Sequence, residues 1–328
     1  MDYIQIPAIA EKVSRIALGT WVMGGWMWGG IDEKEAIQAI IKAVDGGINI
    51  IDTAPIYGFG KAEEIVGKAL RLIGKSHPIV IATKFGLEWN QRGEIRRNSS
   101  PTRIKQEIED SLRRLGLSVI DIYQVHWPDS KVPFEQTAEC LLKLKEQGKI
   151  RAIGVSNFSP RQMELFKKAA PIHTNQPPYN LFEREIEKEL LAYCIKEGIA
   201  TLTYGVLCRG LLTGKFRPDS TFPDGDLRKI DPKFQGENFL RYLQAVEKFR
   251  PIAARYGKSL AQFAACWALM QPGVSVVLWG ARGPSQIEEA FGATGWSLAQ
   301  EDLRMIDKIL TETIPQPIGP EFMAPIEG

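Results

Sequence analysis

The stretch I48-N-I-I-D-T-A-P-I-Y-G-F-G60 begins as an apolar strand and ends in polar and turn-forming residues. Its β-branched residues favour a buried β-strand up to Asp52, and Pro55 and the glycines that follow predict a turn. A carboxylate at the buried end of a strand is unfavourable unless another group pairs with it. Asp52 therefore indicates that another part of the chain supplies a partner at this strand end.

Similar apolar runs recur along the chain and alternate with amphipathic helical stretches. Most are apolar on both faces, as expected for parallel strands covered by crossover helices. We count eight of them: R15-I-A-L-G19, I48-N-I-I-D52, I79-V-I-A-T-K84, V119-I-D-I-Y-Q-V-H126, I150-R-A-I-G-V155, I172-H-T-N-Q176, I199-A-T-L-T-Y204 and V274-S-V-V-L278. Eight such units predict an α/β fold, a closed (β/α)8 TIM barrel, as a single domain over residues 1–328.

The intervening segments carry ordinary helix signals. Helix starts are expected at Asp32, Ser100-Pro101, Pro133 and Pro160, and one helix is expected to end at Gly198.

Three other segments are irregular. Y3-I-Q-I-P and E11-K-V-S-R predict an N-terminal hairpin that plugs the lower end of the barrel. An excursion over residues 205–257 is long enough to be either functional or disordered. The proline-rich tail T313–P325 is expected to wrap over the barrel mouth.

Composition excludes several classes of function. With 41 basic and 39 acidic residues, the net charge is +2, which is too small to attract nucleic acid or an anionic membrane surface. The short basic run Arg96-Arg97 is expected to lie in a solvated loop. No apolar run approaches the roughly 20 residues of a transmembrane helix, and the N-terminus lacks a secretory signal pattern. The four cysteines lack CxxC spacing, and the three histidines lack metal-ligand spacing. We expect a cytoplasmic protein without a metal site.

Polar residues stand where the predicted strands end. They are Thr20, Asp52, Lys84, His126, Ser156, Asn157, Gln176 and Tyr204, with Gly280 and Arg282 after the eighth strand. Each alone reads as a capping or packing residue. Their occurrence after successive strands favours an active site, because a TIM barrel forms its site at the carboxyl ends of its strands.

The geometry of a barrel predicts how four of these residues act together. Asp52 and Lys84 end neighbouring strands and are expected to form a buried ion pair. The Pro55 turn is expected to bring the Tyr57 hydroxyl near Lys84, whose charge would lower the phenol pKa. His126, ending the next strand, would donate a hydrogen bond to a substrate oxygen. Such a site protonates an oxygen, and a nicotinamide hydride is the natural complement at carbon.

The chain resembles the aldo-keto reductase superfamily from about Leu18 to Leu310, in the bacterial and potassium-channel-β-like branch. The motifs that carry the resemblance are D52-T-A-P-I-Y-G-x-G-x-A-E63, the strand ending in Lys84, V125-H-W-P-D129, G154-V-S-N157, Q176-P-P-Y-N180, G210-L-L-T-G-K215 and G280-A-R-G-P-S-Q286. The resemblance implies NADPH-dependent reduction of an aldehyde or ketone, reversible to alcohol oxidation, with Asp52, Tyr57, Lys84 and His126 as the catalytic tetrad.

The resemblance also implies the contacts of NADP(H). Ser156, Asn157 and Gln176 would bind the nicotinamide carboxamide, and Tyr204 would stack on its ring. The pyrophosphate and its flap would involve Gly205, Leu207, Arg209 and Lys215. The adenosine end would involve Gly280, Arg282, Gln286 and Glu289, with Arg282 at the 2′-phosphate. Thr20, Trp21 and Asp52 complete the implied contacts. Val206, Trp279 and Ala290 depart from the common pattern, which leaves the strength of NADPH preference over NADH open.

Three alternatives compete with this interpretation. G58-x-G60-x-x-E63 is close to a dinucleotide fingerprint, but its last position is Glu and it reads as a tight turn. Lys84 could be the Schiff-base lysine of an aldolase. The chain could also be a cofactor-binding regulatory subunit with weak turnover.

The segment T20-W-V-M-G-G-W-M-W-G-G30 follows the first strand. Its aromatic and methionine residues either pack a surface loop or form an apolar substrate wall at the mouth. We expect Trp21, Trp28, Trp89 and Trp127 to contact a small carbonyl substrate.

Overall fold

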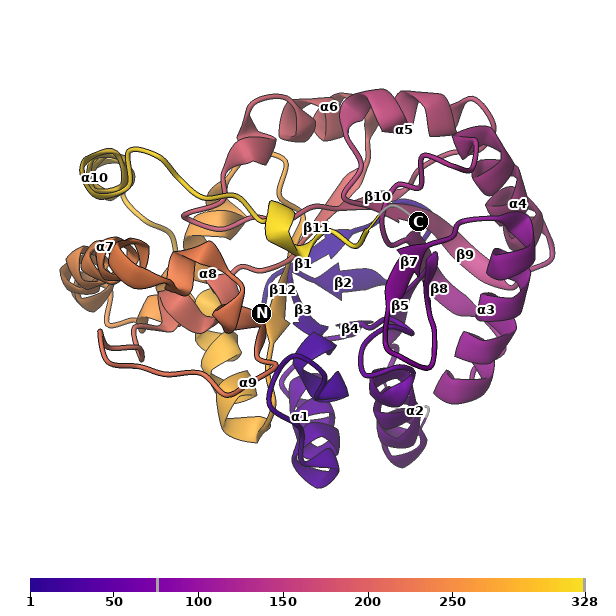
Figure 1. Cartoon of the computed structure of the whole chain (residues 1–328), viewed down its shortest axis with the longest axis horizontal. Coiled ribbons are helices and arrows are strands. Elements are labelled where there is room, and N and C mark those ends of the chain that lie inside the picture. The colour runs from indigo at the N-terminus through magenta and orange to yellow at the C-terminus, as the bar shows by residue number, and fades with distance from the viewer. Residues whose placement is uncertain (75–76, 327–328) are drawn as a thin grey trace.

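A computed structural model of the chain describes residues 1–74 and 77–326. Its centre is a closed barrel of parallel strands, ringed by helices (Figure 1). In spatial order the barrel strands are β10 (Thr174–Gln176), β11 (Ala200–Thr203), β12 (Val276–Gly280), β3 (Ile16–Gly19), β4 (Ile50–Asp52), β5 (Val80–Phe85), β8 (Ile120–Val125) and β9 (Ile150–Ser156). All eight correspond to predicted strands, so the TIM-barrel prediction is confirmed.

The helices follow the strands around the barrel. They are α1 (Glu33–Asp45), α2 (Lys61–Ile73), α3 (Pro101–Leu115), α4 (Phe134–Glu146), α5 (Pro160–Lys167), α6 (Leu190–Glu197), α7 (Gly236–Arg255), α8 (Leu260–Met270), α9 (Pro284–Ala290) and α10 (Gln300–Thr313). Side-chain caps explain several starts: Asp32 accepts from Lys34 N and Glu35 N, and Ser100 accepts from Arg103 N. The predicted starts and the end at Gly198 are confirmed.

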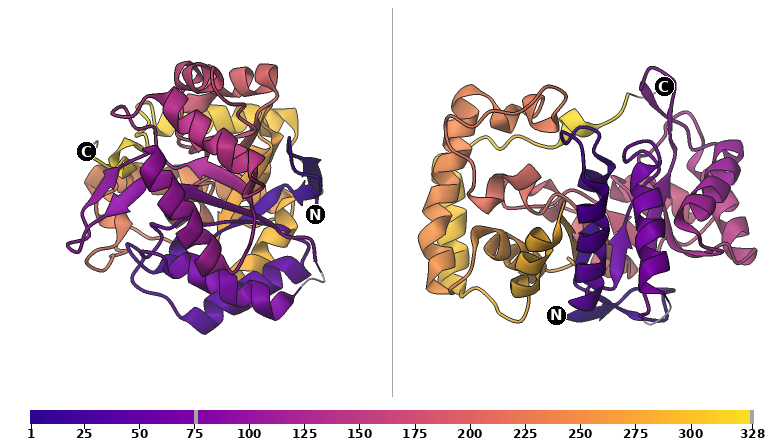
Figure 2. Two further views of the ribbon diagram at one scale, coloured as in Figure 1. Left: turned by 90° about the vertical axis from the view of Figure 1, so that its right-hand side faces the viewer. Right: turned by 90° about the horizontal axis from the view of Figure 1, so that it is seen from below.

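The N-terminal hairpin, β1 (Tyr3–Gln5) and β2 (Lys12–Ser14), closes the lower end of the barrel. Ile6, Ile9 and Val13 are buried in one cluster with the inward-facing residues of the barrel strands, including Ala17 and Ile50. The plug prediction is confirmed. The hairpin and the C-terminal end lie at opposite faces of the molecule (Figure 2).

One region differs from the sequence expectation, and for a second region the structure decides between the two expected alternatives. Arg96 and Arg97 are not in a solvated loop but in β7 (Ile95–Arg97), which pairs with β6 (Leu87–Trp89). Residues 205–257 are ordered, because α7 carries apolar side chains at helical spacing that pack on the core. Short 3₁₀ turns fill the connections: η1 (Trp21–Gly24), η2 (Glu185–Glu187), η3 (Cys208–Thr213), η4 (Leu227–Lys229), η5 (Pro232–Phe234), η6 (Phe291–Ala293) and η7 (Glu321–Met323).

Candidate active site

Asp52, Lys84 and Tyr57 meet at the carboxyl ends of β4 and β5. Lys84 Nζ lies 2.5 Å from Asp52 Oδ1, 3.0 Å from Thr53 O and 3.1 Å from Tyr57 Oη. Lys84 and Asp52 are both buried. The ammonium therefore joins the carboxylate to the phenol, and the expected pairing of Asp52 with Lys84 is present.

The electrostatic effect on Tyr57 differs from the sequence expectation. Burial, followed by the negative charge of Asp52, raises the pKa of the phenol well above its ordinary value. Burial also lowers the pKa of Lys84, although Asp52 opposes this shift. The prediction of a lowered phenol pKa was wrong because it counted the neighbouring cation and not the loss of water. The phenol holds its proton at neutral pH.

The second carboxylate oxygen of Asp52 binds two buried amides. Gln176 Nε2 donates to Asp52 Oδ2 at 2.7 Å, and Gln124 Nε2 donates at 3.3 Å. Gln124 was absent from the predicted site. The sequence held a signal for it. Gln124 lies two positions after Ile122 in the strand, so the alternation of a β-strand places both side chains on the inside of the barrel, where an amide needs a partner.

His126 follows β8 and is buried beside Tyr57, with ring centroids 5.8 Å apart at an interplanar angle of 83°. Burial and then the Lys84 charge lower the pKa of His126 well below its ordinary value. The imidazole is neutral at physiological pH and retains one N–H for donation.

The turn that carries Tyr57 packs directly against the loop after β3. Gly58 has φ +67°, and an added Cβ would lie 2.1 Å from Gly24 O. At Gly24, a Cβ would lie 2.4 Å from the carbonyl carbon of Tyr57. These two glycines allow backbone-to-backbone packing, which holds Trp21 at a ring-centroid distance of 6.0 Å from Tyr57.

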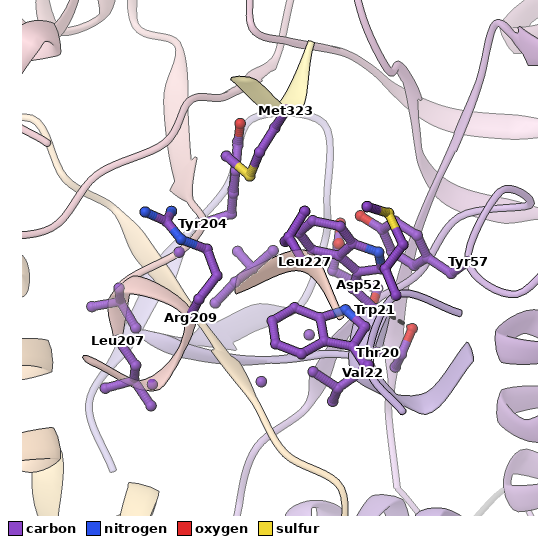
Figure 3. A pocket seen from close by; sticks show the side chains of 18 of the residues that line it. Thr20, Trp21, Val22, Asp52, Tyr57, Tyr204, Leu207, Arg209, Leu227 and Met323 are labelled. Carbon is purple, nitrogen blue, oxygen red and sulfur yellow. Dashed lines mark hydrogen bonds between the residues drawn. The ribbon is translucent and has the colours of Figure 1, made fainter. Parts of the chain in front are cut away.

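A cleft of about 710 Å³ opens over these residues (Figure 3). The figure shows Tyr57, Asp52 and Trp21 on one side of the cleft and Arg209 and Leu207 on the other. All fifteen residues that the resemblance assigned to the cofactor line this cleft: Thr20, Trp21, Asp52, Ser156, Asn157, Gln176, Tyr204, Gly205, Leu207, Arg209, Lys215, Gly280, Arg282, Gln286 and Glu289.

Three cations that line the cleft lie near one another and give it the chemistry of a phosphate-binding site. Lys215, Arg228 and Arg282 all line it, and burial together with the charges of the two arginines lowers the pKa of Lys215. Mutual repulsion among cations is relieved when an anion binds between them. Arg228 was missed from the sequence because it lies in a polar loop without a recognised motif.

The nicotinamide-side candidates hold one another in place. The Tyr204 hydroxyl donates to Asn157 Oδ1 at 2.9 Å, and Ser156 Oγ donates to Gln176 O at 2.8 Å. Trp279, one of the departures from the family pattern, lines the cleft, and its indole Nε1 donates to Gln286 O at 3.0 Å.

Arg209 also belongs to a buried group of ion pairs that the sequence analysis did not predict. Its guanidinium donates to Glu183 Oε1 at 2.6 Å and to Asp231 Oδ2 at 2.9 Å, and Lys233 Nζ lies 2.8 Å from the same Glu183 oxygen. Burial raises the pKa of Glu183, but the positive charges of Arg209 and Lys233 outweigh burial and lower this pKa to about 2. Arg209 thus borders the cleft as part of a buried ion cluster.

Three of the four tryptophans expected at the substrate line the cleft, namely Trp21, Trp28 and Trp127. Trp89 is not among its lining residues. Its ring packs on Phe59 at 5.6 Å and lies under the Arg103 guanidinium at 5.8 Å. The expectation for Trp89 thus differs from the structure, because β6 turns its ring toward Phe59 and Arg103.

The comparisons with known proteins agree with this geometry. Residues 15–311 match the Aldo/keto reductase family. The chain is 53% identical to the Aldo-keto reductase YhdN of Bacillus subtilis, covering 99% of this chain and 98% of that protein. It is 36% identical to the NADH-specific methylglyoxal reductase of Escherichia coli, covering 93% and 97%. A probable voltage-gated potassium channel subunit beta of Arabidopsis thaliana is 33% identical, covering 88% and 90%.

Solved structures extend these likenesses. The glycerol dehydrogenase AKR11B4 of Gluconobacter oxydans has a TM-score of 0.90 and 52% identity, covering 98% of this chain and 99% of that one. An aldo/keto reductase of Klebsiella pneumoniae in complex with NADP and acetate has a TM-score of 0.70 and 27% identity, covering 91% and 92%.

Fold and site define a carbonyl-reducing oxidoreductase of the TIM-barrel type. The chain belongs to the aldo/keto reductase family.

Two further findings concern the described residues alone. No group of three or more His, Cys, Asp or Glu side chains in residues 1–74 and 77–326 is arranged to hold a metal ion. In the same ranges, no helix has the length and apolar character needed to cross a membrane.

Proposed function

We propose that this protein is an NADPH-dependent aldo-keto reductase that reduces aldehydes or ketones to alcohols, reversibly, with Tyr57 as the proton donor. The observation that carries the proposal is the buried contact of Lys84 with both Asp52 and Tyr57, beside a neutral His126. We further propose that residues 1–328 act as one domain.

The donor set of the cleft fits NADP(H). Amide and hydroxyl groups of Ser156, Asn157 and Gln176 suit a carboxamide, and the three cations Lys215, Arg228 and Arg282 suit phosphates. Complexes with NADP in the Klebsiella pneumoniae relative support this assignment. When bound, the nicotinamide supplies the hydride to the carbonyl carbon.

The protein's own residues supply the proton and the orientation. The Tyr57 phenol donates its proton to the carbonyl oxygen, and Lys84 stabilises the resulting phenolate. His126 donates a hydrogen bond to the same oxygen. Asp52 keeps Lys84 in place and is itself held by Gln124 and Gln176. The aromatic side chains Trp21, Trp28 and Trp127 form the walls around the carbonyl compound and exclude water.

The first experiment measures NADPH and NADH oxidation with a panel of carbonyl compounds, and the reverse reaction with alcohols. Glyceraldehyde, glycerol and methylglyoxal belong in the panel because they relate to the substrates named for two relatives. Tyr57→Phe is expected to lower kcat at least about 100-fold and leave the Kd for NADPH within twofold. Tyr3→Phe, on the N-terminal hairpin, is the matched control. Full turnover by Tyr57→Phe refutes the proposal.

The regulatory-subunit alternative is motivated by the channel-β relative. It predicts a single slow turnover with retention of the cofactor, whereas the free enzyme turns over repeatedly with excess NADPH. The aldolase alternative predicts that borohydride traps a covalent adduct at Lys84. Against it stands the Lys84 ammonium, which is already bonded to three oxygens.

A cytoplasmic location is part of the proposal. All four cysteines are buried free thiols, as is usual where thiols stay reduced. Cell fractionation with an antibody to the native protein tests it.

A further inference from the structure

The C-terminal segment 319–325, which we call the strap, crosses the mouth of the barrel. After α10 the chain runs over the strand ends toward the β6–β7 hairpin, as the yellow segment in Figures 1 and 2 shows. Phe322, Met323 and Pro325 of the strap line the cleft, and Figure 3 shows Met323 directed toward it. The strap therefore forms part of the wall that a substrate meets.

The first half of the strap is held by the buried ion cluster. Lys233 Nζ donates to Gly319 O at 2.9 Å. The Phe322 ring lies 5.5 Å from the Arg209 guanidinium and 5.6 Å from Lys233 Nζ. Since Glu183 and Asp231 pair with these cations, this end of the strap contacts a buried network of ion pairs.

The other end of the strap is held by Arg97, the last residue of β7. Arg97 Nε donates to Pro325 O at 3.2 Å, and Nη1 donates to Pro128 O at 2.9 Å. The guanidinium also lies 5.4 Å from the centre of the Trp127 ring. One side chain thus joins the strap, the hairpin and the loop after β8 on the side of the cleft where Trp127 stands.

We propose that Arg97 is a positioning residue that holds the strap across the cleft and thereby selects carbonyl compounds by size. This rests on the proposed reductase function. Arg97 does not touch the reacting atoms, and its effect passes through Pro325 to Met323 and through the ring of Trp127. Release of the strap widens the cleft. Small substrates then make fewer contacts with its wall and bind more weakly, whereas large substrates fit more easily.

The test compares Arg97→Met with Arg96→Met. The neighbouring Arg96 is exposed and projects from the opposite face of the same strand, so it controls for loss of one arginine in β7. Steady-state kinetics at saturating NADPH use propanal as the small substrate and 2-naphthaldehyde as the large one. The same preparations are examined by hydrogen exchange over residues 319–326 and by NADPH titration.

In Arg97→Met we expect the ratio of kcat/KM for 2-naphthaldehyde to that for propanal to rise at least threefold, mainly through KM for propanal. Exchange in the strap is expected to become at least tenfold faster, with the Kd for NADPH within twofold of wild type. Arg96→Met keeps wild-type values, and Arg97→Lys, which retains one donor group, falls between them. A ratio unchanged in Arg97→Met, or changed equally in Arg96→Met, overturns the proposal.

Met323→Ala keeps the proposal testable if Arg97→Met does not fold. Removing this strap side chain is expected to raise the same ratio, and an unchanged ratio overturns the assignment of the strap as a size-selecting wall. Wild-type protein that turns over no carbonyl compound refutes the proposed function instead. In that case, unchanged exchange of the strap in Arg97→Met separately overturns the role of Arg97.

Discussion

Replacement of Glu107 by Gln should remove a loss of stability that the wild-type protein shows as pH rises. Glu107 lies on the inner face of α3 and is 2% exposed. Its Oε2 accepts from Gly86 N and from Arg103 Nε, each at 3.1 Å, and Oε1 has no hydrogen-bond partner among the described residues. Gly86 follows Lys84 by two residues, so this carboxyl holds the backbone just beyond the lysine of the candidate site.

The magnitude follows from the pKa of Glu107. Burial raises it from 4.5 to about 7, with Arg103 and the Gly86 amide opposing the shift and Glu63 adding to it. Between these pH values the folded protein binds more protons than the unfolded chain, so stability falls as pH rises. From pH 5 to pH 8 the loss from this group is about 2–3 kcal/mol, since a shift of one pKa unit corresponds to about 1.4 kcal/mol.

Urea unfolding, followed by the fluorescence of the eight tryptophans, measures this effect at pH 5 and pH 8. A Gln side chain keeps the acceptor for Gly86 and cannot titrate. The difference in unfolding free energy, Glu107→Gln minus wild type, should therefore increase by about 2–3 kcal/mol between the two pH values. Glu109→Gln, an exposed position on the same helix, should show little change. An equal difference at pH 5 and pH 8 would refute the reasoning.

Other predictions concern the site itself. Lys84→Met leaves the buried Asp52 carboxylate without its cation and should lower the free energy of unfolding by about 3–5 kcal/mol, whereas the double variant with Asp52→Asn should recover part of that loss in urea titrations. Arg282→Leu should raise the Kd for NADPH about tenfold or more and that for NADH less than twofold, as measured by fluorescence titration; equal effects on both would contradict a 2′-phosphate contact. Gln124→Met removes a buried donor to Asp52 and should lower unfolding free energy by about 1–3 kcal/mol, a prediction that fails if Gln124→Met unfolds like wild type.

The sequence carried enough information to predict the barrel and the meeting of Asp52, Lys84 and Tyr57 at its candidate active site. Strands buried on both faces read as apolar runs, and the alternation with helices leaves few topologies. Neighbouring parallel strands end side by side, which is why Asp52 and Lys84 could be paired before their contact was seen. Every residue that the family motifs nominated for the cofactor lines the cleft in the structure.

What only the tertiary structure decided depends on burial depth and on contacts between distant segments. The direction of the Tyr57 pKa follows from how much water the fold removes, which no local pattern records. Arg97 and Pro325 are 228 positions apart, and no periodicity links them. Local sequence thus determined the strands, their ends and the chemistry placed there, because these follow from short-range pattern. The closure of the cleft and the charge state of its phenol follow from packing, which brings together groups that the sequence separates.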